Sequence, residues 1–296
     1  MPVHNGLPYL DASVESILAQ TFEDFRLVVL ENGSTDGSRE RLARWAERDP
    51  RITLHHRDER LGGAASSRAA VELTETPVVA RMDADDVADP RRLERQLGVL
   101  DEDPEAVLVT TLHGYLDARG RRVRGRDRWA LGPGSAPMPF SGGCLMFRRD
   151  AYENVGGYRQ VDGTWEDLDL CRRLAEAGRV LVIPEALYWC RFHRASRTAS
   201  APPPVARRPP GEAAAGALLE LNSMQLWSGE RPARLDELRR AARSCGPGRR
   251  LSVRFWARCA ELSPAALRAV LRWRARGRDL LSAPWVPAAR PREWRP

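Results

Sequence analysis

The segment Val78-Val79-Ala80-Arg81-Met82-Asp83-Ala84-Asp85-Asp86 is the most informative part of this 296-residue chain. Pro77 precedes a short apolar run typical of a buried strand, and the run ends in three carboxylates within four residues. Carboxylates crowded at the end of a strand repel one another unless a cation neutralises them. Hard oxygen ligands suit Mg²⁺ or Mn²⁺, and such ions keep open positions for substrate phosphates. The segment therefore predicts a metal–diphosphate site at Asp83 and Asp85; a solvated acidic turn is the alternative.

Strand-like and helix-like segments alternate around this stretch. Strands are predicted at 25–30, 52–55, 77–82 and 107–111, and helices at 13–20, 38–48, 64–72 and 90–100. Pro90 is expected just inside the start of its helix, where its missing N–H costs nothing. The alternation predicts βαβ units, an α/β fold and a mostly parallel central sheet. Ligands of such sheets bind beyond the carboxyl ends of the strands, where the loop carrying Glu31 and Asp36 is expected.

The composition is that of an ordinary globular protein, with 43% hydrophobic and 29% charged residues. Five cysteines, an odd number without a CxxC pair, favour reduced thiols over a disulfide framework. No apolar run approaches the length of a transmembrane span, and the N-terminus lacks the regions of a signal peptide. These features predict a cytoplasmic location.

The charge is unevenly distributed and suggests a division of the chain. Residues 1–200 carry 28 arginines and 32 acidic residues, whereas residues 201–296 carry 19 and 8. Between the two parts lies a proline-rich segment at 201–211, which is expected to be a linker. Helical patterns follow at 213–227, 235–244, 251–262 and 265–281. The expected organisation is an α/β domain at 1–200, the linker, and a basic helical extension at 212–296.

The basic extension contains five of the nine tryptophans. Arginine-rich helices bearing tryptophan suit an anionic surface, so peripheral contact with the inner face of the membrane is one expectation. Packing or acceptor recognition are the alternatives. Nucleic acid is not an expected partner, because no recognised binding motif accompanies the charge.

Four further motifs accompany the acidic segment in a fixed order. They are Pro2-Val3-His4-Asn5-Gly6, Gln20-Thr21-Phe22-Glu23-Asp24-Phe25 with the following Glu-Asn-Gly-Ser-Thr-Asp-Gly-Ser loop, Trp165-Glu166-Asp167-Leu168-Asp169-Leu170, and Arg191-Phe192-His193-Arg194-Ala195-Ser196. Each motif alone is weak, but five in this order are specific. Together they resemble the family 2 glycosyltransferases of GT-A fold, which are inverting enzymes that use nucleotide-diphosphate sugars. The resemblance covers about residues 1–200 and fails over the tail.

The resemblance implies a role for each part of the site. Asp85 would be the main ligand of Mn²⁺ or Mg²⁺, with His193 approaching the metal from the C-terminal side. Asp167, with Glu166 as the fallback, would take the proton from the acceptor hydroxyl as it attacks the anomeric carbon. A single base without a covalent intermediate implies inversion. The implied nucleotide-sugar-binding residues are Pro2, Val3, Asn5, Glu31, Asp36, Arg68, Asp83 and Ala84.

The chain departs from the family pattern in three places. Almost none of the usual apolar first strand precedes Pro2, so the true start is expected upstream of Met1. Ser67-Arg68 replaces the usual Arg-Asn, and Arg68 is expected to face the diphosphate. The Gln-x-x-Arg-Trp signature of processive synthases is absent after Asp167, which favours transfer of one sugar per encounter.

Other interpretations of these residues remain open. The acidic run at 166–169 also suits the first turn of a helix, and His193 suits a structural histidine. A zinc site built from Cys171, Cys190 and His193 is not expected, because a fourth ligand is missing. Residues 83–87 also match the nucleophile motif of haloacid-dehalogenase-type phosphohydrolases, but that mechanism relies on a lysine and this chain has none. Gly142-Gly143 is expected to allow a close backbone approach near the donor sugar.

These observations predict metal-dependent, inverting transfer of one sugar, most often from a UDP-sugar in this family, to an acceptor hydroxyl. The expected acceptor is a cell-envelope or exopolysaccharide glycan, a lipid-linked intermediate or a small metabolite. A non-catalytic sugar-nucleotide-binding protein, or a truncated inactive homologue, is the alternative. The donor sugar and the acceptor are built from loops without portable motifs, so the sequence does not specify them.

Overall fold

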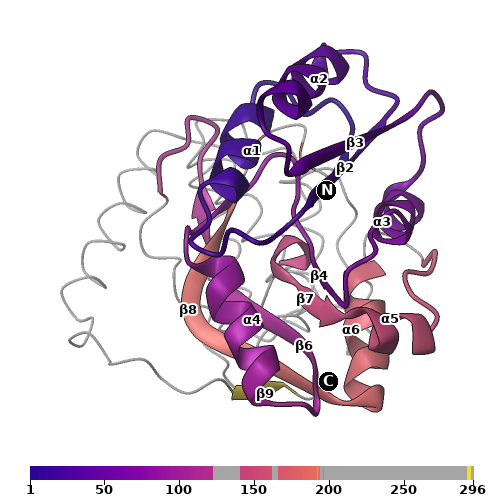
Figure 1. The fold of residues 1–296 in the computed structure, drawn as a ribbon, viewed down its shortest axis with the longest axis vertical. Helices are drawn as coiled ribbons and strands as arrows, with labels where there is room; N and C mark the ends of the chain where they lie inside the picture. The colour runs from indigo at the N-terminus through magenta and orange to yellow at the C-terminus, as the bar shows by residue number, and fades with distance from the viewer. Residues whose placement is uncertain (123–140, 162–165, 192, 194–195, 197–291, 295–296) are drawn as a thin grey trace, which may run out of the picture. The chain divides into compact units, whose positions relative to one another are not determined.

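A computed structural model describes residues 1–122, 141–161, 166–191, 193, 196 and 292–294 (Figure 1). The chain divides into two compact units: the first comprises Met1–Gly114, Asp127–Cys190 and Val286–Pro296, and the second comprises Tyr115–Arg126 and Arg191–Trp285. The predicted linker at 201–211 and the predicted helices between 213 and 281 lie outside the described residues, as does Trp165. The proposed boundary near residue 200 stays a prediction.

The first unit begins with a three-stranded parallel sheet in the order β1-β2-β3. Its strands are β1 (Pro2–Val3), β2 (Leu27–Asn32) and β3 (Ile52–Arg57), and the helices that follow them are α1 (Leu10–Leu18), α2 (Ser38–Arg48) and α3 (Gly63–Glu72). The β2 sequence Leu-Val-Val-Leu-Glu-Asn is buried at all but one position, as expected for a strand covered on both faces. Val3 pairs in register with Glu31, so the loops after β1 and β2 leave the same end of the sheet.

A second sheet has the strand order β4-β7-β6-β8-β5, and β9 also pairs with β8. Its strands are β4 (Val78–Ala80), β5 (Val87–Ala88), β6 (Ala106–Leu116), β7 (Met146–Arg148), β8 (Arg179–Arg191) and β9 (Arg292–Trp294). The pairs β4·β7, β6·β7, β5·β8 and β8·β9 are antiparallel. The α/β prediction is confirmed, but the parallel pairing described here belongs to the first sheet. The alternation that predicted parallel strands ends after residue 111, and β7 enters the second sheet in the opposite direction.

Helices α4 (Arg92–Glu102), α5 (Arg149–Asn154) and α6 (Glu166–Ala177), with the short 3₁₀ turn η1 (Gly142–Cys144), complete the described elements. The prediction for α2 is confirmed at both ends, whereas α4 begins at Arg92 and leaves Pro90 outside. The reason is a turn at Asp89: its carbonyl accepts from the Arg92 N–H at 3.0 Å and its Oδ1 from the Arg91 N–H at 3.1 Å.

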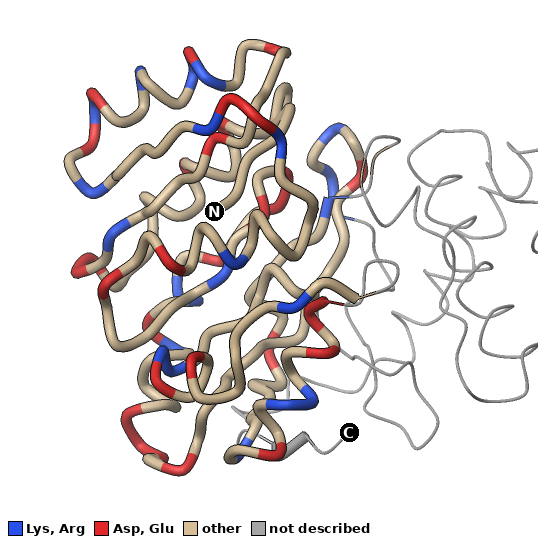
Figure 2. Tube along the Cα trace, turned by 90° about the vertical axis from the view of Figure 1, so that its right-hand side faces the viewer, with Lys and Arg blue, Asp and Glu red and all other residues tan. Residues whose placement is uncertain are grey.

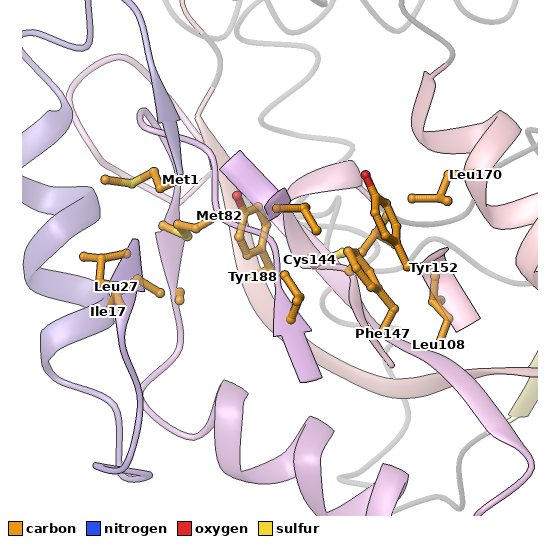
Figure 3. Close-up of a cluster of buried hydrophobic side chains, with 14 of the residues drawn as sticks. Met1, Ile17, Leu27, Met82, Leu108, Cys144, Phe147, Tyr152, Leu170 and Tyr188 are labelled. Carbon is orange, nitrogen blue, oxygen red and sulfur yellow. The ribbon is translucent and has the colours of Figure 1, made fainter. Parts of the chain in front are cut away.

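The hydrophobic core is continuous from the first sheet to the second. Figure 3 shows Met82 and Tyr188 between a group that contains Ile17 and Leu27 and a group that contains Phe147. A second cluster lies beneath α4, where Leu93 and Leu100 pack against side chains of β6, β7 and β8. Figure 1 shows α4 lying across β6 and β8. The loop after β4 therefore leaves from the middle of the packed core.

Charges of both signs are interspersed over the described part of the chain (Figure 2). Among the described helices, none combines the length and the apolarity that crossing a membrane requires.

Candidate functional site

The acidic loop between β4 and β5 is fixed through its backbone. The Asp83 N–H donates to Tyr188 Oη at 3.2 Å, and Ser13 Oγ donates to the Asp86 carbonyl at 2.6 Å. Asp86 itself is buried, whereas Asp83 and Asp85 are partly exposed. The loop therefore presents the two carboxylates of the DxD pattern and keeps the third in the interior.

Arg81 is the buried basic group of this site, with a side chain that is 8% exposed. Its Nη2 donates to Asp83 Oδ1 at 2.8 Å, and its Nη1 lies 3.3 Å from Asp167 Oδ1. Nη1 also donates to Ser67 Oγ and to Tyr158 Oη, each at 2.9 Å. One guanidinium therefore joins the DxD loop to the predicted catalytic base.

Asp167 lies in the first turn of α6, and its side chain is 13% exposed. Tyr158 Oη donates to Asp167 Oδ1 at 2.9 Å. Burial raises the pKa of Asp167, Arg81 opposes the rise, and Asp83 and Glu166 add to it. The pKa rises because burial has the largest effect, which Arg81 and the hydrogen bond from Tyr158 do not cancel. A carboxylate with a raised pKa is a stronger proton acceptor, as a general base requires.

The turn η1 brings two glycines against these carboxylates. A Cβ built on Gly142 would overlap the Asp167 carboxylate, and one built on Gly143 would overlap Tyr188 Oη and lie 2.7 Å from Asp83 Oδ2. Real Cβ atoms essentially never approach other heavy atoms within 3.0 Å, so a larger residue at either position would have to displace these side chains. The predicted close backbone approach is confirmed; a donor sugar beside it stays a prediction.

The loops after β1 and β2 are joined by hydrogen bonds. Asn5 has a φ of 52°, its N–H donates to Ser34 Oγ at 3.0 Å, and its Oδ1 accepts from the Thr35 N–H at 2.8 Å. Asp36 Oδ2 accepts from the Leu7 N–H at 2.9 Å. These hydrogen bonds connect the two loops through Asn5 and Asp36, two of the residues that the resemblance implies for the nucleotide.

Glu31, at the end of β2, has a side chain with no exposed surface. Its Oε1 accepts from the Ser34 N–H at 2.6 Å and its Oε2 from Arg39 Nε at 2.8 Å. Burial opposes ionisation of Glu31, but the bonds from Ser34 and Arg39 outweigh it and lower the pKa. Glu31 is thus an ionised carboxylate that stabilises the loop after β2 through the Ser34 N–H. Its contact with a base or ribose stays a prediction.

The other predicted residues lie in different surroundings. Arg68 is 55% exposed on α3 and pairs with Glu72 at 2.8 Å, so the guanidinium among the site carboxylates is that of Arg81. Ala84 packs partly buried against the core, and Glu166 is buried at the start of α6. Pro2 and Val3 form β1. His193 belongs to the second unit, where its carbonyl accepts from the Ser196 N–H at 3.1 Å, and its role as a metal ligand stays a prediction.

A divalent cation fits the acidic loop by the chemistry of its donor atoms. Asp83 and Asp85 both offer carboxylate oxygens and are partly exposed. Within the described ranges, no three His, Cys, Asp or Glu side chains converge closely enough to hold an ion by themselves. Two carboxylates leave positions for phosphate oxygens, as is usual for Mg²⁺ at phosphate-handling sites.

Comparison with known proteins identifies the family to which the chain belongs. Residues 1–156 match the family model described as Glycosyl transferase family 2. The chain is a family 2 glycosyltransferase. This glycosyltransferase is 34% identical over 199 residues to EpsE of Bacillus subtilis strain 168, a match that covers 64% of this chain and 71% of EpsE. It is 29% identical over 184 residues to the amylovoran biosynthesis glycosyltransferase AmsE of Erwinia amylovora, covering 60% of this chain and 68% of AmsE.

Solved glycosyltransferase structures share the GT-A fold. The mannosyltransferase PcManGT from Pyrobaculum calidifontis, solved with GDP-Man and Mn²⁺, has a TM-score of 0.52 and 18% identity, and the match covers 97% of this chain and 75% of that one. Residues 1–349 of TarS from S. aureus, solved with UDP, have a TM-score of 0.52 and 14% identity, covering 97% and 93%. At these identities the likeness shows the fold alone.

Sequence reasoning missed three residues of this glycosyltransferase site: Arg81, Tyr158 and Tyr188. A signal existed for Arg81, since it lies two residues before Asp83 and strand-like backbone points such residues to the same side. No local signal existed for the tyrosines, because each reaches the site through tertiary packing. Tyr188 is 105 residues from Asp83.

Proposed function

We propose that this glycosyltransferase transfers one sugar from a nucleotide-diphosphate sugar to an acceptor hydroxyl, with inversion at the anomeric carbon and with Mn²⁺ or Mg²⁺. Asp83 and Asp85 would bind the nucleotide-diphosphate sugar, and Asp85 would be the main ligand of the ion. Asp167 would be the general base, and His193 a further ligand of the ion.

The observation that carries the proposal is the contact of one guanidinium with Asp83 and with Asp167. Arg81 reaches them at 2.8 Å and 3.3 Å, so the donor-side carboxylate and the candidate base lie within the span of a single side chain. Inverting transfer needs a base on one side of the anomeric carbon and a charge-stabilised leaving group on the other. Carboxylates held this close, on separate elements, suit those two tasks.

The chain's own residues divide the work as follows. Residues of the loops after β1 and β2 would bind the nucleoside, and the backbone of Gly142 and Gly143 would face the sugar. Asp167 would accept the proton of the acceptor hydroxyl at a carboxylate oxygen. A bound divalent ion would supply Lewis-acid stabilisation of the departing diphosphate.

The nucleotide and the acceptor are proposed at the level of class. UDP is the commonest donor nucleotide in the family that the motifs resemble, and TarS was solved with UDP, whereas PcManGT was solved with GDP-Man. A glycan acceptor of the cell envelope or an exopolysaccharide is supported by the name of AmsE, which assigns that relative to amylovoran biosynthesis.

Calorimetry with UDP and with GDP, each with and without Mn²⁺, tests the donor site. We expect metal-dependent binding of UDP to the wild type, and its loss in Asp85→Asn. Asp101→Asn is the matched control, since Asp101 is an exposed carboxylate on α4. Binding of neither nucleotide would refute the proposed donor site. Turnover of the bound class should then give a product whose anomeric configuration, read by NMR coupling constants, is opposite to that of the donor.

For the tail, we propose a cytoplasmic protein with peripheral contact between its basic extension and the inner membrane face. Flotation with anionic vesicles at low salt should carry the full chain upward. A protein that stays in the soluble fraction would contradict this contact without affecting the donor site.

A further inference from the structure

Arg81 holds a position that simple ion pairing does not require. Its side chain is buried, and its two terminal nitrogens divide their contacts: Nη2 faces Asp83, while Nη1 faces Asp167, Ser67 and Tyr158. Its Nε has no hydrogen-bond partner among the described residues. Leaving a buried donor unpaired costs about 1–3 kcal/mol. The contacts of Nη1 and Nη2 must therefore outweigh the cost of the unpaired Nε.

The placement of Arg81 is enforced from several sides. Its N–H donates to the Leu145 carbonyl at 2.8 Å, and its carbonyl accepts from Arg92 Nη2 at 2.7 Å. Its guanidinium lies 5.4 Å from the centroid of the Tyr158 ring. Because both its backbone and its guanidinium are fixed, Arg81 restricts the positions of the side chains that it contacts.

We propose that Arg81 is a positioning residue for sugar transfer, which orients Asp167 as the base and ties that orientation to the donor-side carboxylate Asp83. This inference rests on the proposed role of Asp167. Arg81 contacts Asp83 at 2.8 Å and reaches Asp167 in two ways: directly at 3.3 Å, and through Tyr158 Oη, which accepts from Arg81 and donates to Asp167 at 2.9 Å each. A change at the donor end would thereby reach the base across one side chain.

The electrostatics of Asp167 give this arrangement a measurable signature. The groups that act on the Asp167 carboxylate are Arg81, Asp83, Glu166 and Tyr158, and Arg81 is the cation among them. Cys171, one turn further along α6, is also influenced by Asp167. Replacing Arg81 by a neutral side chain removes the attraction that opposes the effect of burial, so the pKa of Asp167 should rise further.

Titration of carboxyl ¹³C signals by NMR reads this effect without any turnover. The spectrum of Asp167→Asn assigns the Asp167 signal, and the wild type is compared with Arg81→Gln, Arg81→Lys and Arg95→Gln. Arg95 is the matched control, because it is a partly exposed arginine that pairs with Glu185 at 2.8 Å and is not among the groups that act on Asp167. We expect the Asp167 midpoint to move to higher pH in Arg81→Gln and to stay at the wild-type value in Arg95→Gln.

Kinetics then test orientation separately from charge. Arg81→Lys keeps the charge but replaces a planar fork by a single ammonium that cannot hold two carboxylates in the same way. We expect its kcat to fall about 10²-fold, with a smaller change in the donor KM, because misplacement by about 1 Å can cost that much. If Arg81→Gln does not fold, the NMR comparison is made on Arg81→Lys and Tyr158→Phe. Arg81→Lys keeps the cation, so its Asp167 midpoint should stay near the wild-type value. Tyr158→Phe removes a hydrogen bond that lowers the pKa of Asp167, so its midpoint should move to higher pH.

Three outcomes would overturn the inference: an unchanged Asp167 midpoint in Arg81→Gln, a midpoint in Arg81→Lys raised as far as in Arg81→Gln or in Tyr158→Phe, or a wild-type kcat in Arg81→Lys. A wild type that transfers no sugar from any donor would instead refute the proposed function. The NMR comparison would still show whether Arg81 controls Asp167.

Discussion

The backbone of Gly142 lies against the carboxylate of Asp167 so closely that a Cβ at this position would overlap it. We expect Gly142→Ala to push Asp167 from its place and to lower kcat about 10²-fold. The same overpacking should reduce the free energy of unfolding by about 1–3 kcal/mol. Steady-state kinetics and urea unfolding measure the two effects.

Gly98→Ala is the control for that substitution. Gly98 lies within α4, and a Cβ there would meet nothing within 4 Å. This variant should keep the wild-type kcat and gain about 0.5–1 kcal/mol of stability, because alanine favours the helix over glycine. A Gly142→Ala variant with wild-type kcat would show that the position of Asp167 does not limit the reaction.

Asp167→Asn should abolish transfer and preserve donor binding. The amide keeps the shape of the side chain but cannot accept the proton, and loss of a general base typically costs about 10²–10⁴-fold in rate. Calorimetry with nucleotide and a transfer assay on the same preparation separate the two effects. Unchanged turnover would disprove the assignment of the base, and retained binding without any wild-type turnover would favour the non-catalytic alternative.

Asp167→Asn should also stabilise the fold at alkaline pH. Burial raises the pKa of Asp167, so the folded state binds this proton more tightly than the unfolded chain does. Its contribution to stability is therefore greatest at low pH and is lost as pH rises through the window from the unfolded to the folded pKa. Above that window, asparagine removes the cost of a buried negative charge. Thermal melting at pH 8 should give an equal or higher Tm for the variant, with the advantage shrinking in acid.

The pH dependence of transfer should report the same group. Asp167 must be ionised to act as the base, so kcat/KM should fall as pH decreases through its raised pKa. The acid limb is therefore expected at higher pH than for an ordinary aspartate. A limb in the ordinary aspartate range would contradict either the raised pKa or the role of Asp167.

Asp36 should matter for donor affinity more than for chemistry. Its Oδ2 accepts from the Leu7 N–H at 2.9 Å and its Oδ1 from the Ser38 N–H, at the start of α2, at 3.0 Å. Asp36→Ala removes both contacts and should cost about 0.5–2 kcal/mol of stability, as the loss of a helix cap does. The donor KM should rise while kcat at saturating donor changes little. Asp101→Ala is the exposed control, and equal KM values in the two variants would count against this role.

The sequence predicted the elements that carry their own periodicity. The helix at 38–48 was placed at both ends, because Leu42 and Trp45 mark one apolar face. In the second sheet, β4 and β6 were predicted as strands at 77–82 and 107–111, but β5 and β7 were not, because they are two and three residues long and show no repeat. β8 spans 13 residues but contains Pro184, which weakens a strand pattern. Strands like these form by pairing with neighbouring strands from other parts of the chain, so the local sequence does not predict them.

The site divides in the same way. Asp83 and Asp85 were assigned from their residue types and spacing, and Asp167 from the resemblance of its motif to the family; their roles stay predictions. Arg81 was missed because its meaning depends on Asp167, which lies 86 residues further along the chain. Glu31 and Asp36 were assigned to the nucleotide, and the structure shows their oxygens engaged by neighbouring N–H groups. A motif identifies a polar residue without stating which partner it has.

Helix α1 joins two parts of the site that the chain keeps far apart. It begins soon after the Asn5 loop, and its Ser13 Oγ holds the Asp86 carbonyl, while its Ser16 Oγ accepts from the Ala88 N–H at 3.1 Å. The separation between the nucleoside loops and the carboxylate loop is therefore a property of this helix and exists before any donor arrives. In the proposed reaction, the donor would meet two loops whose spacing is already set, so little of its binding free energy would be spent on ordering them.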